Sequence, residues 1–171
     1  MKDIILLYDE CCIYEIVILN YFLKCTGSEM QFCSVDGQTI KAMEGYSINC
    51  DISLDEIDCS NVRSFIVPGG EISNIDREEV LELLKKINDQ EIIIGGICAG
   101  TDILAKAGIL KDISSTHSSD FDCVCDKNII TARPNAYVDF AIEIGKALNI
   151  FEDEADLQET IEFWKNHKMI Y

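Results

Sequence analysis

The chain has 171 residues and a formal charge of −17, from 14 basic and 31 acidic side chains. Its length predicts one domain over residues 1–171, since roughly 100 to 200 residues per domain is usual. The acidic residues are spread along the chain without a basic cluster, so a phosphate backbone would be repelled and we expect no nucleic-acid partner. No apolar run approaches the roughly 18 residues that a membrane span requires, so we expect no membrane protein.

The N-terminal segment and the cysteines indicate a soluble, cytoplasmic chain. The apolar stretch at residues 4–8 is too short for a secretory signal, and Asp9 and Glu10 follow it, so we expect a first strand there. Nine cysteines in an unexported chain are more typical of free thiols than of disulfides, because cytosolic reductants keep thiols reduced and an odd number cannot pair fully. We expect most of them to be small buried side chains.

Short apolar runs alternate with helical stretches along the chain. Strands are expected at residues 4–8, 30–35, 64–67, 91–94 and 128–132. Helices are expected at residues 11–25, at 76–90 with a capping box formed by Asp76 and Glu79, at 99–108, after Pro134, and at about 153–167. This alternation predicts βαβ units and a mainly parallel sheet with helices on both faces, an α/β three-layer sandwich. The segment at residues 36–58 gives no clear pattern.

Cys98 lies in the sequence Gly96-Ile97-Cys98-Ala99-Gly100, at the junction of an expected strand and an expected helix. The pattern G-x-C-x-G matches the G-x-S-x-G nucleophile elbow, in which flanking glycines let one residue adopt a strained conformation with an exposed side chain. A thiol at a helix N-terminus also feels the positive end of the helix dipole, which favours the thiolate. The motif therefore predicts Cys98 as a nucleophile. The alternative is that the glycines only allow close strand–helix packing and Cys98 is inert.

Glu15 is the unusual polar residue of the first expected helix. On a wheel of about 100° per residue that starts at Glu10, Asn20 falls at about 280° and Lys24 at about 320°, whereas Glu15 falls at about 140°, opposite this polar stripe. A buried carboxylate without a partner costs several kcal/mol, so such a group stays protonated or finds a hydrogen-bond partner. Functional sites of parallel sheets gather at the carboxyl ends of the strands, where Glu15 would meet Cys98. If the helix is rotated or starts later, Glu15 instead faces water.

The turn after residues 64–67 and one histidine are further candidates. Gly70 follows Pro68-Gly69, and a glycine turn lets the backbone approach a ligand closely, so the amides of this turn and of Ala99 are candidates for an oxyanion hole. A plain strand-ending turn explains the same glycines. His117 is the candidate histidine base for Cys98, although its Ser/Thr/Asp-rich loop is also typical of a surface. The second histidine, His167, is expected at the surface of the last helix.

The sequence gives little reason to expect a metal or a cofactor. Cys123 and Cys125 place two thiols on one face of a strand, but their spacing differs from the C-x2-C pairs of zinc sites. The glycines before Cys98 match neither the G-x-G-x-x-G pattern nor a Walker A loop. We therefore expect neither metal nor cofactor.

Taken together, these residues resemble the ThiJ/PfpI superfamily, over essentially the whole chain. The resemblance is carried by Glu15 and by four segments of the sequence: residues 65–70 (Phe-Ile-Val-Pro-Gly-Gly), 97–100 (Ile-Cys-Ala-Gly) with 104–110, 129–132 and 138–140. It implies a class I glutamine amidotransferase-like, flavodoxin-like sandwich, a homodimer and no cofactor.

Within the resemblance, Cys98 is the elbow cysteine, Glu15 its carboxyl partner, and Gly70 and Ala99 the backbone donors. His117 is carried over as the histidine, although no proline follows it here. Arg63 stands where an aspartate often precedes the Pro-Gly-Gly strand, a change that we expect to matter only at the surface.

Two functions remain open at this point. The first is an enzyme in which the Cys98 thiolate attacks a small reactive carbonyl or amide substrate, as in the glyoxalases, deglycases and hydrolases that the resemblance implies. The second is a non-enzymatic oxidative-stress sensor or chaperone, in which Cys98 is oxidised and stabilised by Glu15. Isonitrile-hydrating members of the superfamily have an aspartate-containing segment after the first strand. Residues 9–15 do not reproduce it, so we do not expect that reaction. A third, simpler reading is a degenerate binding or structural subunit.

Overall fold

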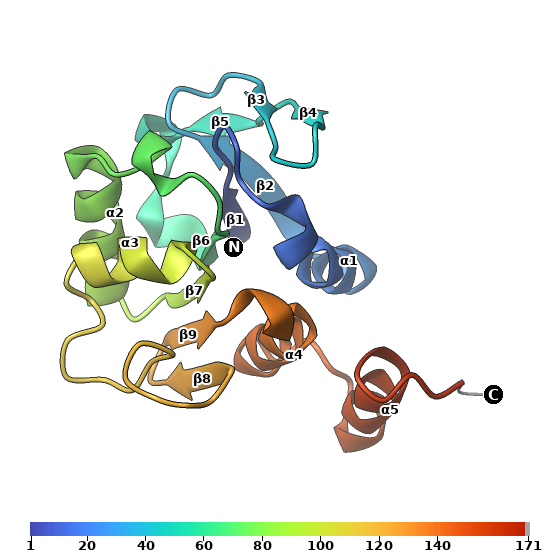
Figure 1. Cartoon of the computed structure of the whole chain (residues 1–171). Helices are drawn as coiled ribbons and strands as arrows, with labels where there is room; N and C mark the ends of the chain where they lie inside the picture. Colours follow the sequence, from blue (N-terminus) through green and yellow to red (C-terminus); the bar gives the residue numbers. More distant parts are fainter. Residues whose placement is uncertain (170–171) are drawn as a thin grey trace.

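The computed structural model describes residues 1–169 as a twisted central sheet with helices on both faces (Figure 1). Within these residues one sheet has seven strands in the order β5-β2-β1-β6-β7-β9-β8, of which only β8 runs antiparallel to its neighbour. The strands are β1 (Lys2–Leu6), β2 (Glu29–Ser34), β5 (Ile52–Ser53), β6 (Val62–Val67), β7 (Ile93–Ile97), β8 (Cys123–Asp126) and β9 (Ile129–Ala132). The α/β prediction is confirmed.

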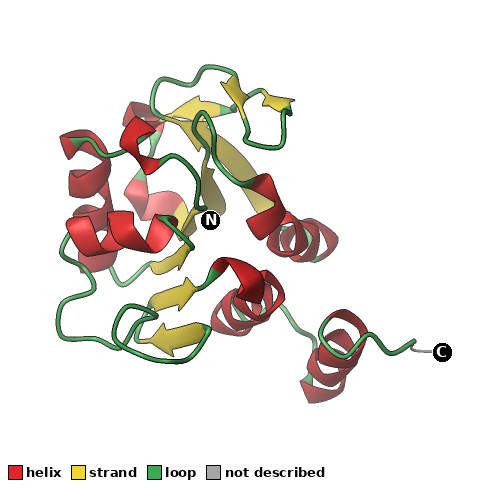
Figure 2. Cartoon of the chain, in the orientation of Figure 1, coloured by secondary structure: helices red, strands yellow, loops and turns green. Residues whose placement is uncertain are grey.

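The helices form two layers, one on each side of the sheet (Figure 2). Helices α1 (Val17–Cys25) and α4 (Tyr137–Ala147) pack together on one face, and α2 (Glu78–Asp89) and α3 (Gly100–Lys106) cover the other. A last helix, α5 (Glu154–Trp164), lies beyond α4. No helix within residues 1–169 combines the length and the apolar character needed to cross a membrane.

The central strands are buried on both faces, which explains their continuous apolar runs. Ile5 and Leu6 of β1 and Phe65 and Ile66 of β6 have no exposed surface. Helices on both sides of a parallel sheet leave no strand face for water, so alternation of polar and apolar residues is lost. The strand order places β1 and β6 near the centre of the sheet, with β2 and β7 beside them. Because β1, β6 and β7 are parallel, their carboxyl ends lie at the same end of the sheet.

Strand β7 is longer than the expected strand at residues 91–94. It continues through Gly95 and Gly96, which pair with Ile66 and Val67 of β6. A β-carbon at Gly95 would lie 2.7 Å from Cζ of Phe140. These glycines therefore serve close packing of helices on the sheet, and the turn begins only at Cys98.

The prediction of one helix over residues 11–25 is wrong. The chain leaves β1 through Glu10, at φ 61°, and Cys11 forms an isolated antiparallel bridge with Gly70. A single 3₁₀ turn, η1 (Ile13–Glu15), precedes α1, which begins only at Val17. The bridge to Gly70 holds the segment extended where a regular helix would have to start.

The predicted capping box of α2 is also wrong. Arg77 is the N-cap residue and makes no side-chain cap, whereas Asp76 forms an ion pair with Lys106 of α3. The helix starts later than expected, so Asp76 lies outside its first turn.

The segment without a clear pattern forms very short elements. Strands β3 (Ile40–Lys41) and β4 (Ser47–Ile48) make a two-residue hairpin ladder, followed by β5 and the turns η2 (Leu54–Glu56) and η3 (Cys59–Asn61). The hairpin is tied to the chain before η1, because the Glu10 amide donates to the Lys41 carbonyl at 2.8 Å and the Met43 amide donates to the Cys11 carbonyl at 3.0 Å. Strands of two residues are too short to show a period in the sequence.

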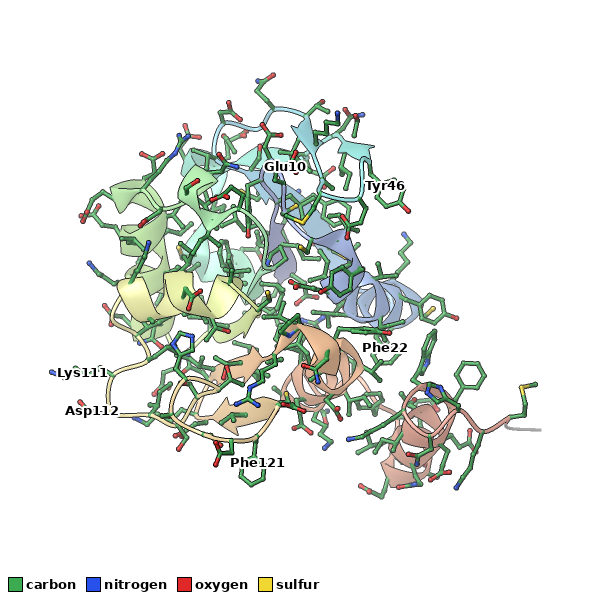
Figure 3. All side chains as sticks on the ribbon, in the orientation of Figure 1. Glu10, Phe22, Tyr46, Lys111, Asp112 and Phe121 are labelled. Atoms are coloured by element: carbon green, nitrogen blue, oxygen red, sulfur yellow. The ribbon has the colours of Figure 1, made fainter. Side chains whose placement is uncertain are left out.

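The last helices begin and end differently from the prediction. Pro134 opens a 3₁₀ turn, η5 (Pro134–Ala136), that leads into α4, and α5 ends at Trp164, before His167. The Trp164 ring packs against Phe22 of α1, with ring centroids 5.9 Å apart. Figure 3 shows Phe22 pointing from α1 toward α5. This aromatic contact fastens α5 to the helical layer.

Arg63 has a structural role that the sequence did not reveal. Its Nε donates to Oδ1 of Asp3 at 3.0 Å, and its second guanidinium nitrogen pairs with the other oxygen. The Asp3 side chain has no exposed surface, and Ser64 also donates to it at 2.7 Å. The expectation that Arg63 matters only at the surface is therefore wrong: Arg63 neutralises a buried carboxylate at the amino ends of β1 and β6.

Candidate active site around Cys98

Cys98 lies at the carboxyl end of β7, in a left-handed backbone conformation with φ 55°. Such a conformation is uncommon for a residue with a β-carbon and costs on the order of 1 kcal/mol or more. It is held by the Cys98 amide, which donates to the Ala132 carbonyl at the end of β9 at 2.9 Å. The sharp strand-to-helix turn predicted from the sequence is confirmed. Helix α3 starts two residues later, at Gly100.

Two glycines allow neighbouring segments to pack closely around Cys98. A β-carbon at Gly100 would overlap the carbonyl oxygen of Val67, so only glycine lets α3 start against the end of β6. A β-carbon at Gly69 would lie 2.6 Å from Cβ of Cys98, 2.9 Å from its Sγ and 2.8 Å from Oε2 of Glu15. Gly69 thus borders both the thiol and the carboxyl group.

Glu15 is buried beside Cys98, with only 1% of its surface exposed. The turn η1 brings it there, and the Gly69 amide donates to its Oε2 at 2.7 Å. The Tyr14 hydroxyl donates to Oε1 at 3.3 Å, and the carboxyl group and the Cys98 thiol both border Gly69. The predicted burial of Glu15 next to the cysteine is confirmed, although the residue lies in a 3₁₀ turn and not in a helix.

Burial and mutual repulsion dominate the acid–base behaviour of the pair. Desolvation raises the pKa of Glu15, against the lowering effect of the Gly69 hydrogen bond. Desolvation and the negative charge of Glu15 raise the pKa of the Cys98 thiol from 9.0 to about 11, while the Ala99 amide acts in the opposite direction. The expected net preference for thiolate at the helix N-terminus is therefore not observed beside an ionised Glu15.

Burial and mutual repulsion keep the two groups from ionising together, so the first proton that the pair loses leaves one proton between them. When Glu15 carries the proton, its negative charge is gone and its hydroxyl becomes a donor to the sulfur, which favours the thiolate. When the thiol carries the proton, Glu15 is an acceptor. A pair of this kind supplies a nucleophile and a proton donor from a single proton.

Of the two backbone amides predicted as oxyanion donors, that of Ala99 acts on the pair directly and that of Gly70 belongs to the residue after Gly69. The Ala99 amide interacts with the Cys98 sulfur. Gly70 follows Gly69 in the chain and has φ 128°, a conformation suited to glycine. Among residues 1–169 no protein acceptor is recorded for the Gly70 amide, so this donor can serve a bound oxygen. Both amides remain candidates for an oxyanion hole.

His117 is held by a different partner from the one expected. Its Nε2 lies 3.0 Å from Oδ1 of Asp102, in the first turn of α3, and both side chains are largely exposed. Asp102 also acts on Cys98, whose pKa its charge raises. The structure therefore connects His117 to the cysteine turn through Asp102, a residue that the sequence analysis did not single out.

Other residues of the site were also missed. Tyr14 contacts Glu15 through its hydroxyl, and its ring packs edge-on against Tyr137, with centroids 6.1 Å apart. Glu44 of the hairpin accepts from the Tyr14 amide at 2.8 Å. The sequence of the hairpin shows no periodic pattern of apolar residues, so its contact with η1 could not be predicted. Within residues 1–169, no three His, Cys, Asp or Glu side chains are grouped to hold a metal ion.

A polar cavity of about 280 Å³ lies at the carboxyl ends of β1 and β2, and neither Glu15 nor Cys98 lines it. Tyr8 lines it, and the hydroxyl of Tyr8 donates to the Pro68 carbonyl at 2.8 Å, in the turn that carries Gly69. Asp9, Asn74 and Arg77 are among its other lining residues.

Comparisons with known proteins identify the family and the fold. A model of the DJ-1/PfpI family matches residues 1–147. The deglycase TK1284 of Thermococcus kodakarensis is 30% identical over 118 residues, which cover 68% of this chain and 71% of that protein. The glutathione-independent glyoxalase DJR-1.2 of Caenorhabditis elegans is 25% identical over 150 residues, covering 78% of this chain and 81% of that protein.

The fold has the same relatives. The crystal structure of the DJ-1 superfamily protein Atu0886 from Agrobacterium tumefaciens superimposes with a TM-score of 0.86 at 26% identity, covering 98% of this chain and 100% of that one. The family model ends before α5, which begins at Glu154. A match that includes β1 to α4, on a chain with this sheet order, shows that the protein belongs to the DJ-1/PfpI family.

Proposed function

We propose that this protein is a cysteine-dependent enzyme that acts on a small reactive carbonyl or amide compound, as its deglycase- and glyoxalase-named relatives suggest. The observation that carries the proposal is the strained Cys98 with the buried carboxyl group of Glu15 beside it, both against Gly69. A strained backbone at the end of a central strand, next to an acid of raised pKa, is typical of a reaction centre and has no evident structural purpose.

In the proposed first step, the Cys98 thiolate attacks the carbonyl carbon of the substrate. A C–S bond forms, the π electrons of the C=O bond move to oxygen, and Glu15 gives its proton to that oxygen. The amides of Gly70 and Ala99 stabilise the developing negative charge, as oxyanion-hole donors do. Glu15, now ionised, can accept a proton from the adduct in the next step. We assign proton transfer to Glu15 because its carboxyl group contacts the cysteine, whereas the imidazole of His117 pairs with Asp102.

The test is a steady-state assay with methylglyoxal-type and amide substrates. Cys98→Ser should abolish activity toward the substrate that is used, while Cys25→Ser, at an exposed cysteine on α1, should leave it unchanged. Equal activity of wild type and Cys98→Ser would reject the nucleophile role.

The oxidation-sensor function is the second candidate, because a partly buried thiol beside a protonatable carboxyl group can hold an oxidised sulfur by hydrogen bonding. Mass spectrometry after mild peroxide tests it. Cys98 should be oxidised faster than the exposed Cys25 and Cys125; an equal or slower rate would reject this function.

We also propose a homodimer. Val17 and Tyr21 of α1 are 48% and 54% exposed, and Phe163 of α5 is 44% exposed, so apolar surface remains on the helical layer. Light scattering at several concentrations measures the mass, and a monomer at all of them would reject the proposal.

A further inference from the structure

The charged groups that act most strongly on the Cys98 site are acidic. The ionisable groups that act on the Cys98 thiol include Glu15 and Asp102, and Glu44 acts on Glu15. No cationic group is among the main influences on the pKa of Cys98, Glu15 or Tyr14 within the described residues. A site of one sign focuses its field and selects ligands by charge.

Glu44 is fixed to the segment that carries Glu15. Its Oε1 accepts the Tyr14 amide at 2.8 Å, and the neighbouring Met43 amide is bonded to the Cys11 carbonyl at 3.0 Å. Two contacts thus fix the hairpin over η1, beside the chain that leads into α1 in Figure 1. The carboxylate keeps a second oxygen, Oε2, for which no protein partner is recorded within residues 1–169, and the side chain is exposed. Figure 3 shows Tyr46 of the same hairpin pointing outward.

The residue whose amide Glu44 accepts also carries an exposed aromatic ring. Tyr14 is 46% exposed, its hydroxyl is fixed on Glu15, and its ring is held edge-on by Tyr137. A carboxylate combined with an aromatic ring is a favourable environment for an ammonium or guanidinium group, through ionic and cation–π attraction. An anionic group at the same place would face Glu44 without a compensating cation.

We propose that Glu44 is a specificity-determining residue, which with the ring of Tyr14 selects compounds by charge as they approach Cys98. Carbonyl compounds with a cationic group are favoured, and those with a carboxylate are disfavoured. The claim about substrates rests on the proposed enzymatic function. The claim about access of charged compounds to the Cys98 thiol does not, so the two claims are tested separately.

The first experiment measures access to the thiol without any turnover. Two methanethiosulfonate reagents of similar size are used, one with a trimethylammonium group and one with a sulfonate group. In either reaction the Cys98 thiolate forms an S–S bond with the reagent and methanesulfinate leaves. Peptide mapping gives the rate at Cys98 and, in the same sample, at the exposed Cys25 as an internal reference. The ratio of the cationic to the anionic rate, normalised to Cys25, measures the charge preference.

Glu44→Gln is the decisive variant, because the amide oxygen of glutamine can still accept the Tyr14 amide while the charge is lost. Glu159→Gln is its matched control, since Glu159 is equally charged and exposed on α5, beyond α4. We expect Glu44→Gln to lower the normalised ratio about three- to tenfold at low salt, as expected for a unit charge several ångströms away. Glu159→Gln should leave it unchanged, and 0.5 M salt should reduce the wild-type ratio.

Either of two results would overturn the proposal: an unchanged ratio in Glu44→Gln, or an equal fall in both variants, which would reflect net charge alone. A second experiment compares kcat/KM for phenylglyoxals with a para-trimethylammonium or a para-carboxylate group, which should differ in the same direction. Absence of turnover with every substrate would reject the enzymatic function, whereas the labelling ratio would still decide the role of Glu44.

Discussion

Glu15 and Cys98 come from opposite sides of the central strand β6 and meet at a residue without a side chain. A β-carbon at Gly69 would lie 2.8 Å from Oε2 of Glu15 and 2.6 Å from Cβ of Cys98, and the Gly69 amide donates to the carboxyl group at 2.7 Å. Glu15 follows β1 and Cys98 follows β7, the two neighbours of β6 in the sheet. The strand order therefore brings the acid and the thiol together, and Gly69 leaves them room to interact.

The shared proton predicts a pH profile with two steps. The rate of Cys98 alkylation by a neutral reagent should rise once as the pair loses its first proton, and again near pH 11, where the thiol loses its proton beside an ionised Glu15. Glu15→Gln removes the negative charge that helps to raise this pKa. The variant should show a single step below pH 11, measured by peptide mapping of iodoacetamide adducts. Identical profiles for the two proteins would show that the groups titrate independently.

Glu15 and His117 should contribute differently to catalysis. Loss of a proton donor in contact with the reacting group typically costs about 100-fold or more, so Glu15→Gln should lower kcat/KM by at least that factor. His117→Ala should lower it by less than about tenfold, because the imidazole is held at Asp102. Steady-state kinetics measures both, with whichever methylglyoxal-type or amide compound the wild type turns over. A larger loss in His117→Ala than in Glu15→Gln would reverse the assignment.

Gly69→Ala should reduce activity while the protein remains folded. The new methyl group would press on Cβ of Cys98 and on the carboxyl group of Glu15. Displacement of reacting groups by about 1 Å costs on the order of 100-fold in rate, so a loss of at least about tenfold is expected. Gly27→Ala is the control, since a β-carbon there meets nothing within 4 Å and the residue lies between α1 and β2, so its backbone strain should cost stability and not activity. Activity near the wild-type value in Gly69→Ala would mean that the pair is not tightly packed.

Gly100→Ala should destabilise the fold more than Gly108→Ala. The first methyl group overlaps the Val67 carbonyl oxygen, whereas the second meets no atom within 4 Å and only strains a backbone with φ 77°. Overpacking against the backbone should cost about 3 kcal/mol, and the strain about 1 kcal/mol. Urea unfolding of both variants gives the comparison. Equal losses would indicate that α3 can move away from β6 at little cost.

Arg63→Ala should lower the free energy of unfolding by about 2 kcal/mol, because it leaves the carboxylate of Asp3 buried with Ser64 as a remaining donor. The value is set below that of a fully buried pair because 30% of the Arg63 side chain is exposed. Lys146→Ala, which breaks an exposed pair with Glu143, should change it by less than about 0.5 kcal/mol. Urea unfolding compares them. A loss no greater than that of Lys146→Ala would show that Asp3 is well satisfied without Arg63.

The sheet and the elbow were predictable because their signals are local. The apolar runs before Pro68 and Cys98 mark central strands, and glycine at position 100 has a direct steric reason. The burial of Glu15 was predicted from a helical wheel that assumed a helix from Glu10. The burial is correct although that assumption is not, because residues 10–12 are not helical and Glu15 lies in η1.

The contacts between distant segments could not be predicted. The bridge of Cys11 to Gly70, the hairpin contact of Glu44 with Tyr14 and the pairing of Asp102 with His117 all join residues whose own sequence neighbourhood gives no indication of the partner. The same holds for Arg63, which was expected to matter only at the surface, and its buried partner Asp3. Strand pairing brings these residues together, and that is a property of the whole chain.

The Asp3–Arg63 pair lies at the amino ends of β1 and β6, and the Glu15–Gly69 contact follows the carboxyl ends of the same two strands. The length of the sheet separates the ion pair from the reaction centre. Substitutions at the amino ends of these strands can therefore change how long the protein survives heating with little effect on turnover. Substitutions at the carboxyl ends can change turnover without an equal loss of thermal stability. Directed evolution of the two properties could then proceed in parallel, on separate sets of positions.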